Sequence, residues 1–216
     1  VSQYGSDLMV GRDVSVSAGR DISVIGSDID AMRDISMKAA ENLTLSSAAD
    51  ESHSYSKSKK LKTQEDHVKQ IASNVTAGGD VVFSAGKDMT LVSSRINAGD
   101  EAYLVAGGQL DLLAAQDSDY SLYDKKKKGS FGKLQTRHDE VTQVTNVGSE
   151  IKTGGDLTLK SGDDQRYQVA KLESGKNLTL DSGGSITFEG VKDLHDESHT
   201  KTNNNAFWNS SKGKGH

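Results

Sequence analysis

The chain has 216 residues, of which 22 are Gly and none is Pro or Cys, and its formal net charge is −5 at pH 7. Without Cys it has no disulfide framework, no thiolate zinc site and no Cys nucleophile, and the acidic balance argues against nucleic-acid binding. About 11 prolines would be expected at average usage, so their absence predicts a fold made almost entirely of strand ladders, in which Pro cannot donate.

A short motif recurs from the first residues onward: a Gly or small residue, a polar position, then an apolar–any–apolar triplet. Gly19–Val24 and Gly86–Leu91 are clear copies. The steps between successive polar positions are 8, 13 and 8 residues in each of three groups, which gives a repeat of 21 residues interrupted by two insertions. The polar positions are Asp13, Asp21, Asp34 and Asn42, then Asp80, Asp88, Glu101 and Gln109, then Asp156, Asp164, Asn177 and Ser185.

Each repeat is long enough for three short strands. An apolar residue stands five positions before every polar position, and the apolar–any–apolar alternation has the period of a strand with one buried face. One such coil cannot bury its apolar face alone, whereas stacked coils share a core. We therefore predict an all-β fold, a right-handed parallel β-helix with three strands in each 21-residue coil. Its predicted core includes Val16, Ile22, Met37, Leu43, Phe83, Leu91, Leu104, Leu112, Leu159 and Leu180.

The repeated polar positions are expected at the corners between strands. Short Asp and Asn side chains bond local backbone at corners, which favours a structural role over ligand binding. The segment Gln165–Tyr167 puts a polar residue where the repeat requires an apolar one. We therefore expect the coil near Asp164 to be irregular.

The β-helix body is predicted over residues 1–189, with insertions at 48–72 and 116–148 and with 190–216 as a truncated third insertion or tail. All three segments open on similar acidic sequences, and Lys-rich stretches follow in the first two. Because each insertion leaves and rejoins the coil at the same point of the repeat, we predict that the insertions are protruding, hairpin-like arms.

The insertions and the tail hold all six His and six of the eleven aromatic residues, and each carries a net charge of +1, whereas the body carries −8. Protruding aromatic, His and Lys side chains are candidates for contact with a partner. The alternative interpretation is that the rings pack onto the rod and the lysines only keep the hairpins soluble. The candidate contact residues are Tyr55, Lys59, Lys60, Tyr120, Tyr123, Lys125, Lys126, Lys127, Lys128, Phe131, Phe207 and Trp208.

No motif predicts a metal, cofactor or catalytic site. His195 and His199 flank two acids, but their order is not the His-Glu-x-x-His of a zinc site. The tetrad Asp-Glu-Ser-His at 196–199 also occurs at 50–53, so inherited repeat sequence explains it better. The Gly-Gly-Asp sequences lack the nine-residue period of calcium-binding repeats. Polysaccharide lyases and glycosidases can be β-helical, but cleavage would require paired carboxylates, and nothing marks two acids as a pair.

The motif Ala-Gly-x-Asp-apolar-x-apolar, together with Leu112–Ser118 and Thr153–Leu159, resembles the haemagglutinin repeats of filamentous haemagglutinins. These are two-partner-secretion exoproteins of Gram-negative bacteria, among them the contact-dependent growth inhibition exoproteins, and the Lys-rich insertions resemble their second repeat region. The resemblance implies a secreted filament segment on the cell surface. It also implies two partners: the outer-membrane transporter during export, and the surface or outer membrane of a target cell afterwards.

Three functions stay open on the sequence. The leading hypothesis is a non-enzymatic structural and interaction segment that acts in adhesion or contact-dependent toxin delivery. The alternatives are a carbohydrate-binding or polysaccharide-cleaving β-helix and a passive spacer. Under the leading hypothesis we expect no cofactor, no nucleic-acid partner and no small-molecule substrate.

Overall fold

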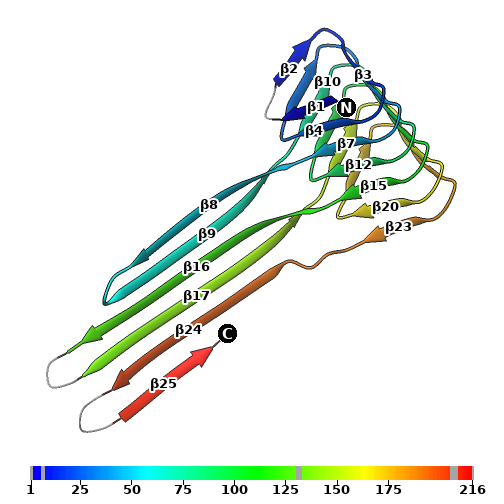
Figure 1. The fold of residues 1–216 in the computed structure, drawn as a ribbon. Coiled ribbons are helices and arrows are strands. Elements are labelled where there is room, and N and C mark those ends of the chain that lie inside the picture. Colours follow the sequence, from blue (N-terminus) through cyan, green and yellow to red (C-terminus); the bar gives the residue numbers. More distant parts are fainter. Residues whose placement is uncertain (1, 6–7, 130–132, 205–208, 216) are drawn as a thin grey trace. The chain divides into compact units, whose positions relative to one another are not determined.

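The computed structural model describes residues 2–5, 8–129, 133–204 and 209–215 (Figure 1). Every regular element in these ranges is a β-strand. The chain divides into two compact units, which we describe separately. The first, here called the rod, comprises residues 1–48, 70–115 and 146–191. The second, here called the arm sheet, comprises residues 49–69, 116–145 and 192–216.

The rod consists of three parallel sheets, and the chain visits them in rotation (Figure 1). One sheet holds β1 (Ser2–Gly5), β4 (Ile22–Ile25), β7 (Leu43–Ser46), β12 (Met89–Val92), β15 (Leu110–Leu113), β20 (Gln165–Gln168) and β23 (Ile186–Glu189). The next holds β2 (Leu8–Gly11), β5 (Asp28–Ala31), β10 (Asn74–Ala77), β13 (Arg95–Ala98), β18 (Glu150–Thr153) and β21 (Lys171–Ser174). The third holds β3 (Val14–Ala18), β6 (Ile35–Ala39), β11 (Val81–Ala85), β14 (Ala102–Ala106), β19 (Leu157–Ser161) and β22 (Leu178–Ser182).

Strand register reproduces the 21-residue repeat. Val14 pairs with Ile35 across β3 and β6, and Val81 pairs with Ala102 across β11 and β14. Where an insertion intervenes the offset grows to 46 residues, as between Ile35 and Val81, or to 55, as between Ala102 and Leu157. The insertions therefore add residues without shifting any strand, because each in-phase pairing keeps the apolar face inward. The predicted parallel β-helix is confirmed.

The core lies inside the stacked coils, with alternate residues of each strand pointing inward. Strand β6 shows the pattern, since Ile35, Met37 and Ala39 are buried and the residues between them are exposed. Of the ten side chains that the sequence assigned to the core, nine are buried: Val16, Ile22, Met37, Leu43, Phe83, Leu91, Leu104, Leu112 and Leu159. The tenth, Leu180, is half-buried and packs against the core, because β22 is the edge strand of its sheet.

The coil near Asp164 is regular, so the expected irregularity is wrong. Strand β20 pairs in register with β15 on one side and β23 on the other. Gln165 occupies the apolar position with no exposed surface, and its Nε2 donates to the carbonyls of Leu159 (3.1 Å) and Asp181 (2.8 Å). Its Oε1 accepts a 2.7 Å bond from the Tyr167 hydroxyl. A buried amide with its hydrogen bonds made can replace a leucine here without distorting the strand.

The repeated polar residues join successive coils at two of the three corners. The carboxylate of Asp13 accepts a bond from the backbone N–H of Asp34, and Asp34 in turn accepts from Asp80, at 3.2 and 2.8 Å. Asp21 accepts in the same way from the N–H of Asn42, at 3.0 Å. The partner is thus the equivalent residue of the next coil, not the local backbone that the sequence suggested. A residue at this position satisfies a corner N–H that no strand can reach.

Glycines allow the corners to stack closely. A Cβ on Gly99 would overlap the carbonyl oxygen of Gly78, and a Cβ on Gly154 would overlap that of Gly99. The backbone N–H groups of these glycines donate to carbonyls of the preceding coil. The Gly154 N–H, for example, donates to the Ala98 carbonyl at 3.0 Å. At Gly99 and Gly154 the absence of a Cβ therefore lets backbone pass directly over backbone.

The third corner alternates between a tight turn and an arm. After β4, β12 and β20 the chain turns through one residue with a positive φ, namely Gly26 (56°), Ser93 (45°) or Val169 (52°). After β7, β15 and β23 a long hairpin follows instead. The chain returns to the rod at a buried serine: Ser73 Oγ accepts from the N–H of Ser27 at 3.1 Å, and Ser149 Oγ accepts from the N–H of Ser94 at 3.1 Å.

Candidate functional site

The arm sheet is a single layer of six antiparallel strands in the order β8-β9-β16-β17-β24-β25 (Figure 1). Its strands are β8 (Ala48–Lys57), β9 (Leu61–Ile71), β16 (Ala115–Lys128), β17 (Leu134–Val147), β24 (Leu194–Asn204) and β25 (Asn209–Gly215). Among the arm side chains that the structure describes, Leu122 alone is buried. Both faces of the sheet therefore present side chains to solvent along most of their length.

Each arm is a hairpin that joins its neighbours edge to edge. In the first turn the backbone N–H of Ser58 donates to the carbonyl of Leu61 at 2.7 Å, and the Ser58 hydroxyl accepts from the Leu61 N–H at 3.1 Å. Strand β9 then pairs with β16, placing Val68 opposite Ser118 and Leu61 opposite Lys125. Strands β17 and β24 pair in the same way over eleven residues.

The spacing of the arms along the chain matches the spacing of strands. Each coil adds one strand to every rod sheet, and each hairpin adds two strands to the arm sheet. Neighbouring strands in any sheet lie about 4.8 Å apart, so hairpins on every second coil give both units a repeat of about 9.6 Å. If every coil carried an arm, two coils would supply four arm strands within about 9.6 Å, a distance that holds only two. This match explains why tight corners separate the hairpins.

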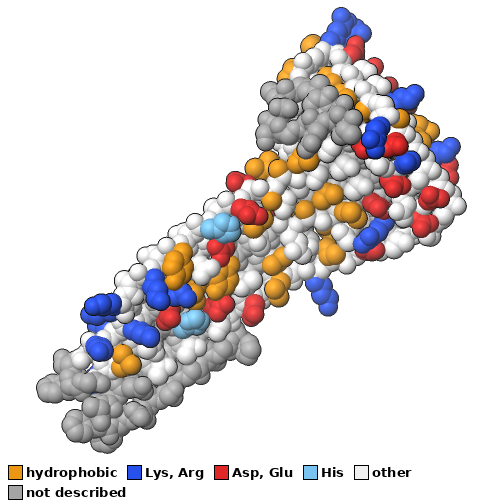
Figure 2. Space-filling model, in the orientation of Figure 1, with side chains coloured by type: hydrophobic (Ala, Val, Ile, Leu, Met, Phe, Trp, Pro, Cys, Tyr) orange, Lys and Arg blue, Asp and Glu red, His pale blue; other side chains and the backbone are white. Residues whose placement is uncertain are grey.

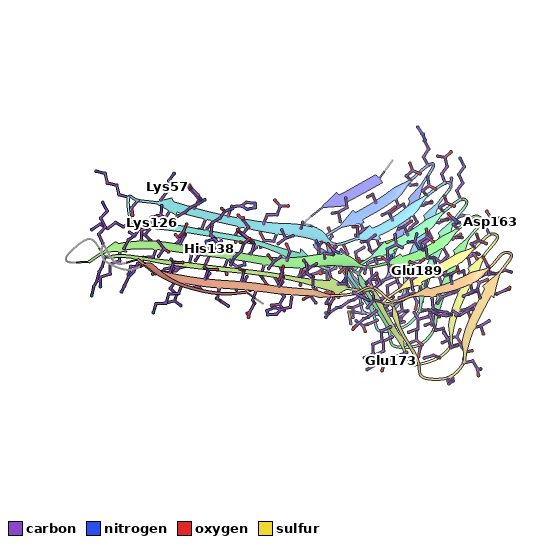
Figure 3. All side chains as sticks on the ribbon, turned by 90° about the horizontal axis from the view of Figure 1, so that it is seen from below. Lys57, Lys126, His138, Asp163, Glu173 and Glu189 are labelled. Carbon is purple, nitrogen blue, oxygen red and sulfur yellow. The ribbon has the colours of Figure 1, made fainter. Side chains whose placement is uncertain are left out.

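Charge is segregated along the arms. Toward the hairpin turns lies a cluster that we call the basic tip, and farther from the turns lies a second cluster that we call the acid–histidine band (Figure 2). Figure 3 shows Lys57 and Lys126 near the turns and His138 farther along the sheet. The basic tip comprises Lys57, Lys59, Lys60, Lys62, Lys125, Lys126, Lys127, Lys128, Lys133, Arg137 and Lys201. The acid–histidine band comprises Glu51, His53, Glu65, Asp66, His67, Asp119, His138, Asp139, Glu140, His195, Glu197 and His199.

Two open hollows lie at the basic tip. One is lined by Lys57, Lys60, Lys62, Lys126 and their neighbours, with Asp124 as its acid. The other is lined by Tyr123, Lys125, Lys127, Gln135, Thr136, Arg137 and Lys201. Both hollows are therefore strongly cationic and would attract an anionic group.

Two of the candidate tyrosines contact cations of the arms. The Lys62 ammonium lies 5.9 Å from the ring centre of Tyr55, and the Arg137 guanidinium lies 5.7 Å from that of Tyr123. Tyr55 is 60% exposed, whereas Tyr123 is half-buried. Cation–π contacts of this kind are worth about 0.5–1 kcal/mol at exposed sites, so they orient the rings without burying them.

The other candidate contact residues divide into three groups. Lys59, Lys60 and Lys125–Lys128 are exposed. Tyr120 is half-buried, and its pKa is raised first by loss of solvent and then by the nearby Glu140 carboxylate. The last group lies outside the described residues: Phe131, Phe207 and Trp208.

Histidine–aspartate pairs connect neighbouring strands of the acid–histidine band. Nδ1 lies 2.7 Å from Oδ1 in the pair His67–Asp119 and also in the pair His199–Asp139, and each His stands directly opposite its Asp in the register. The third pair, His53–Asp66, has a separation of 2.8 Å. In each pair the hydrogen bond to Asp is the main cause that raises the pKa of the His above 6.5. A protonated His is thereby favoured.

The separation of charge along the arms was not predicted from the sequence. In each of the insertions 48–72 and 116–148, a net charge of +1 hides an acidic stretch, a central Lys run and a second acidic stretch, and the hairpin folds the two acidic stretches together. The order of charges along each insertion contains this signal, which a sum discards.

No cluster that could hold a metal ion, with three or more His, Cys, Asp or Glu ligands, occurs in the described ranges. A shallow hollow on the rod is lined by Ala77, Asn97, Ala98, Gly99, Lys152, Thr153 and Gly154. None of these side chains is a carboxylate, so that hollow offers no acid pair for glycoside cleavage. The described residues also contain no helix that could span a membrane.

Comparison with known proteins identifies the repeat. The family model described as hemagglutinin repeat matches the chain three times, over residues 1–64, 52–134 and 130–215. The chain belongs to the hemagglutinin repeat family. Each match begins or ends within an arm, so the hemagglutinin repeat includes arm strands as well as coils. No solved structure matches this chain.

The curated relatives that match this chain are far longer proteins. The tRNA nuclease CdiA of Escherichia coli (strain STEC_O31) is 30% identical over 181 residues, which is 83% of this chain and 6% of that protein. The 16S rRNA endonuclease CdiA of Enterobacter cloacae subsp. cloacae is 26% identical over 215 residues, 88% of this chain and again 6% of the relative. The Hemolysin of Proteus mirabilis is 27% identical over 101 residues, 46% of this chain and 6% of the relative. The chain thus corresponds to a small part of each.

Proposed function

We propose that this chain is a structural, non-enzymatic segment of a secreted filament on the surface of a Gram-negative bacterium, and that its arms contact the surface or outer membrane of a target cell. The relatives named CdiA and Hemolysin support the first part. The observation that carries the second part is the arm sheet itself, a single layer with both faces open and with its cations gathered at the turns. The contact would act in adhesion or contact-dependent toxin delivery.

The rod suits export through an outer-membrane two-partner-secretion transporter. Each coil contacts only the coils beside it, so folding can proceed coil by coil as the chain emerges. No Cys is present to cross-link the chain before passage. The transporter is therefore proposed as the partner during export.

Variants of the intact natural protein that lack the first two arms, here called arm-less, test the proposal. Replacing residues 47–72 with one Gly reproduces the tight corner Gly26–Ser27, because Ser73 then follows that Gly as Ser27 follows Gly26. Replacing residues 114–148 with one Gly does the same before Ser149. We expect both replacements together to leave secretion and surface display unchanged and to reduce target-cell attachment and growth inhibition.

Unchanged attachment and inhibition by the displayed arm-less protein would show that the arms are a passive spacer. If the doubly replaced protein is not displayed, each replacement is tested alone for display and attachment, since each removes one hairpin and keeps the rod register. Turnover of a polysaccharide by the purified chain, abolished by acid-to-amide substitution, would contradict the non-enzymatic assignment.

A further inference from the structure

The basic tip carries more positive charge than the arm sheet neutralises. Among the described residues no carboxylate lies within 4.0 Å of the ammonium groups of Lys57, Lys59, Lys60 or Lys125–Lys128, whereas Lys87 and Lys171 of the rod do form ion pairs. In the acid–histidine band, by contrast, every His has a carboxylate partner. Like charges on neighbouring strands destabilise a sheet. An anion bound from outside would relieve this repulsion.

The lysines face outward in several directions at once. Successive residues of a strand point to opposite faces, so Lys125 and Lys127 lie on one side of β16 and Lys126 and Lys128 on the other. Lys59 and Lys60 lie in the turn between β8 and β9. The cations thus surround the end of the sheet and do not line one groove. This arrangement fits a plane of phosphates approached end-on better than it fits the groove of a duplex.

The residue types also indicate a lipid surface. Lys presents a compact point charge, and clusters of four to eight Lys or Arg are typical of proteins that bind anionic lipids. Tyr55 and Tyr123, each beside a cation of the tip, have the amphipathic rings that suit the boundary between headgroups and acyl chains. We propose that the basic tip binds the phosphate headgroups of an anionic lipid surface. This inference rests on the proposed function, since it names the chemistry that the arms contact.

Vesicle co-sedimentation of the whole 216-residue chain tests the inference. The probes are vesicles of phosphatidylcholine alone and vesicles of phosphatidylcholine with phosphatidylglycerol. The tip variant is Lys59→Gln, Lys60→Gln, Lys126→Gln. The matched control is Lys38→Gln, Lys152→Gln, Lys160→Gln, which removes the same charge from three exposed rod lysines. Binding is measured at low and at high salt.

We expect the chain to bind the anionic vesicles and not the zwitterionic ones. Each Lys near an anionic surface contributes about fivefold, so the tip variant should lose about a hundredfold in affinity. The rod variant should stay near wild type, and a tip variant with Arg at the same three positions should bind like wild type. Binding should weaken as salt shortens the Debye length from about 10 Å to about 3 Å.

Three outcomes would overturn the inference: equal binding to both kinds of vesicle, equal losses in the tip and rod variants, or displacement from vesicles by a short DNA duplex at comparable affinity. A thermal unfolding curve of each variant establishes that the arms stay folded. If the arm-less protein fails to attach to target cells while the tip variant still binds anionic vesicles like wild type, the proposed function stands and the phosphate assignment falls. If the arm-less protein attaches normally, the proposed function itself fails.

Discussion

The rod and the arm sheet are both made of β-strands, yet different forces hold them together. The rod stacks parallel strands around side chains with almost no exposed surface, such as Leu104, and closes its corners with Asp and Gly. The arm sheet pairs antiparallel strands in one layer, and Leu122 is its one buried side chain among those described. Packing therefore constrains almost every inward residue of the rod. The arms are free to carry charge.

The largest difference in stability between the rod and the arms is expected for a charge placed in the rod core. Leu104→Asp puts a carboxylate where no exposed surface remains, and we expect a loss of more than about 4 kcal/mol in the free energy of unfolding. The matched change in the arms is Leu61→Asp, at a side chain that is 38% exposed and surrounded by lysines, where we expect a change within about 0.5 kcal/mol. Thermal unfolding followed by circular dichroism measures both. Equal effects would mean that the rod core is not what holds the coils.

A methyl group at a stacked corner should come next in size. Gly154→Ala forces a Cβ into the carbonyl of Gly99, and backbone cannot move aside cheaply, so we expect a loss of about 2–4 kcal/mol. Gly19→Ala adds the same methyl where nothing lies within 4 Å, and there we expect no loss. Denaturant unfolding of the two variants measures the difference. Similar values for both would contradict the close-stacking explanation of the corner glycines.

The buried amide of the rod predicts a smaller effect. Gln165→Leu restores the apolar residue of the repeat but leaves the Tyr167 hydroxyl without its acceptor, in a place where burial already raises the pKa of that phenol. An unsatisfied buried donor costs about 1–3 kcal/mol. The double variant Gln165→Leu, Tyr167→Phe removes both partners and should recover part of the loss. Denaturant unfolding tests this cycle, and a single variant more stable than wild type would refute it.

Most of the rod could be predicted because its buried apolar positions repeat at a fixed interval. A coil that must stack on its neighbours repeats its apolar positions every 21 residues, and two insertions cannot hide twelve aligned positions. Gln165 escaped the prediction because its acceptability depends on Tyr167 and on two carbonyls, one of them sixteen residues away. The bonds of Asp13 and its equivalents were placed locally because the next coil lies 21 residues away in sequence.

The candidate site was predictable only in part. The sequence placed Lys and Tyr side chains on hairpin-like insertions, and these insertions form the strands of the arm sheet. It could not show that the hairpins join into one sheet, because that depends on the match between one strand per coil and two strands per arm. Pairing between β9 and β16 is what brings His67 opposite Asp119, 52 residues apart. Chemistry that arises between repeats is invisible in any one of them.

The smallest expected effect concerns pH and the arms alone. The pKa values of His53, His67 and His199 are raised by their Asp partners, so these pairs stabilise the arm sheet fully below the ordinary pKa of about 6.5 and stop doing so as pH rises through the raised values. The pKa values of Asp66 and Asp139 are lowered by the same bonds, so that stabilisation is present above about 3.8 and is lost as pH falls through the lowered values. The arms should therefore be most stable in mildly acidic solution, whereas the rod has no such pairs.

Titration of the His ring protons by NMR measures this directly. Asp139→Asn keeps the shape of the side chain but removes its charge, and it should lower the pKa of His199 toward 6.5 because the remaining partner, Glu197, lies farther away at 3.7 Å. His53, whose partners are Asp66 and Glu51, serves as the internal control and should titrate as before. If His199 keeps its raised pKa in that variant, the cross-strand bond does not form in solution. The band would then be an ordinary solvated surface, and these His–Asp pairs would add no pH dependence to the stability of the arms.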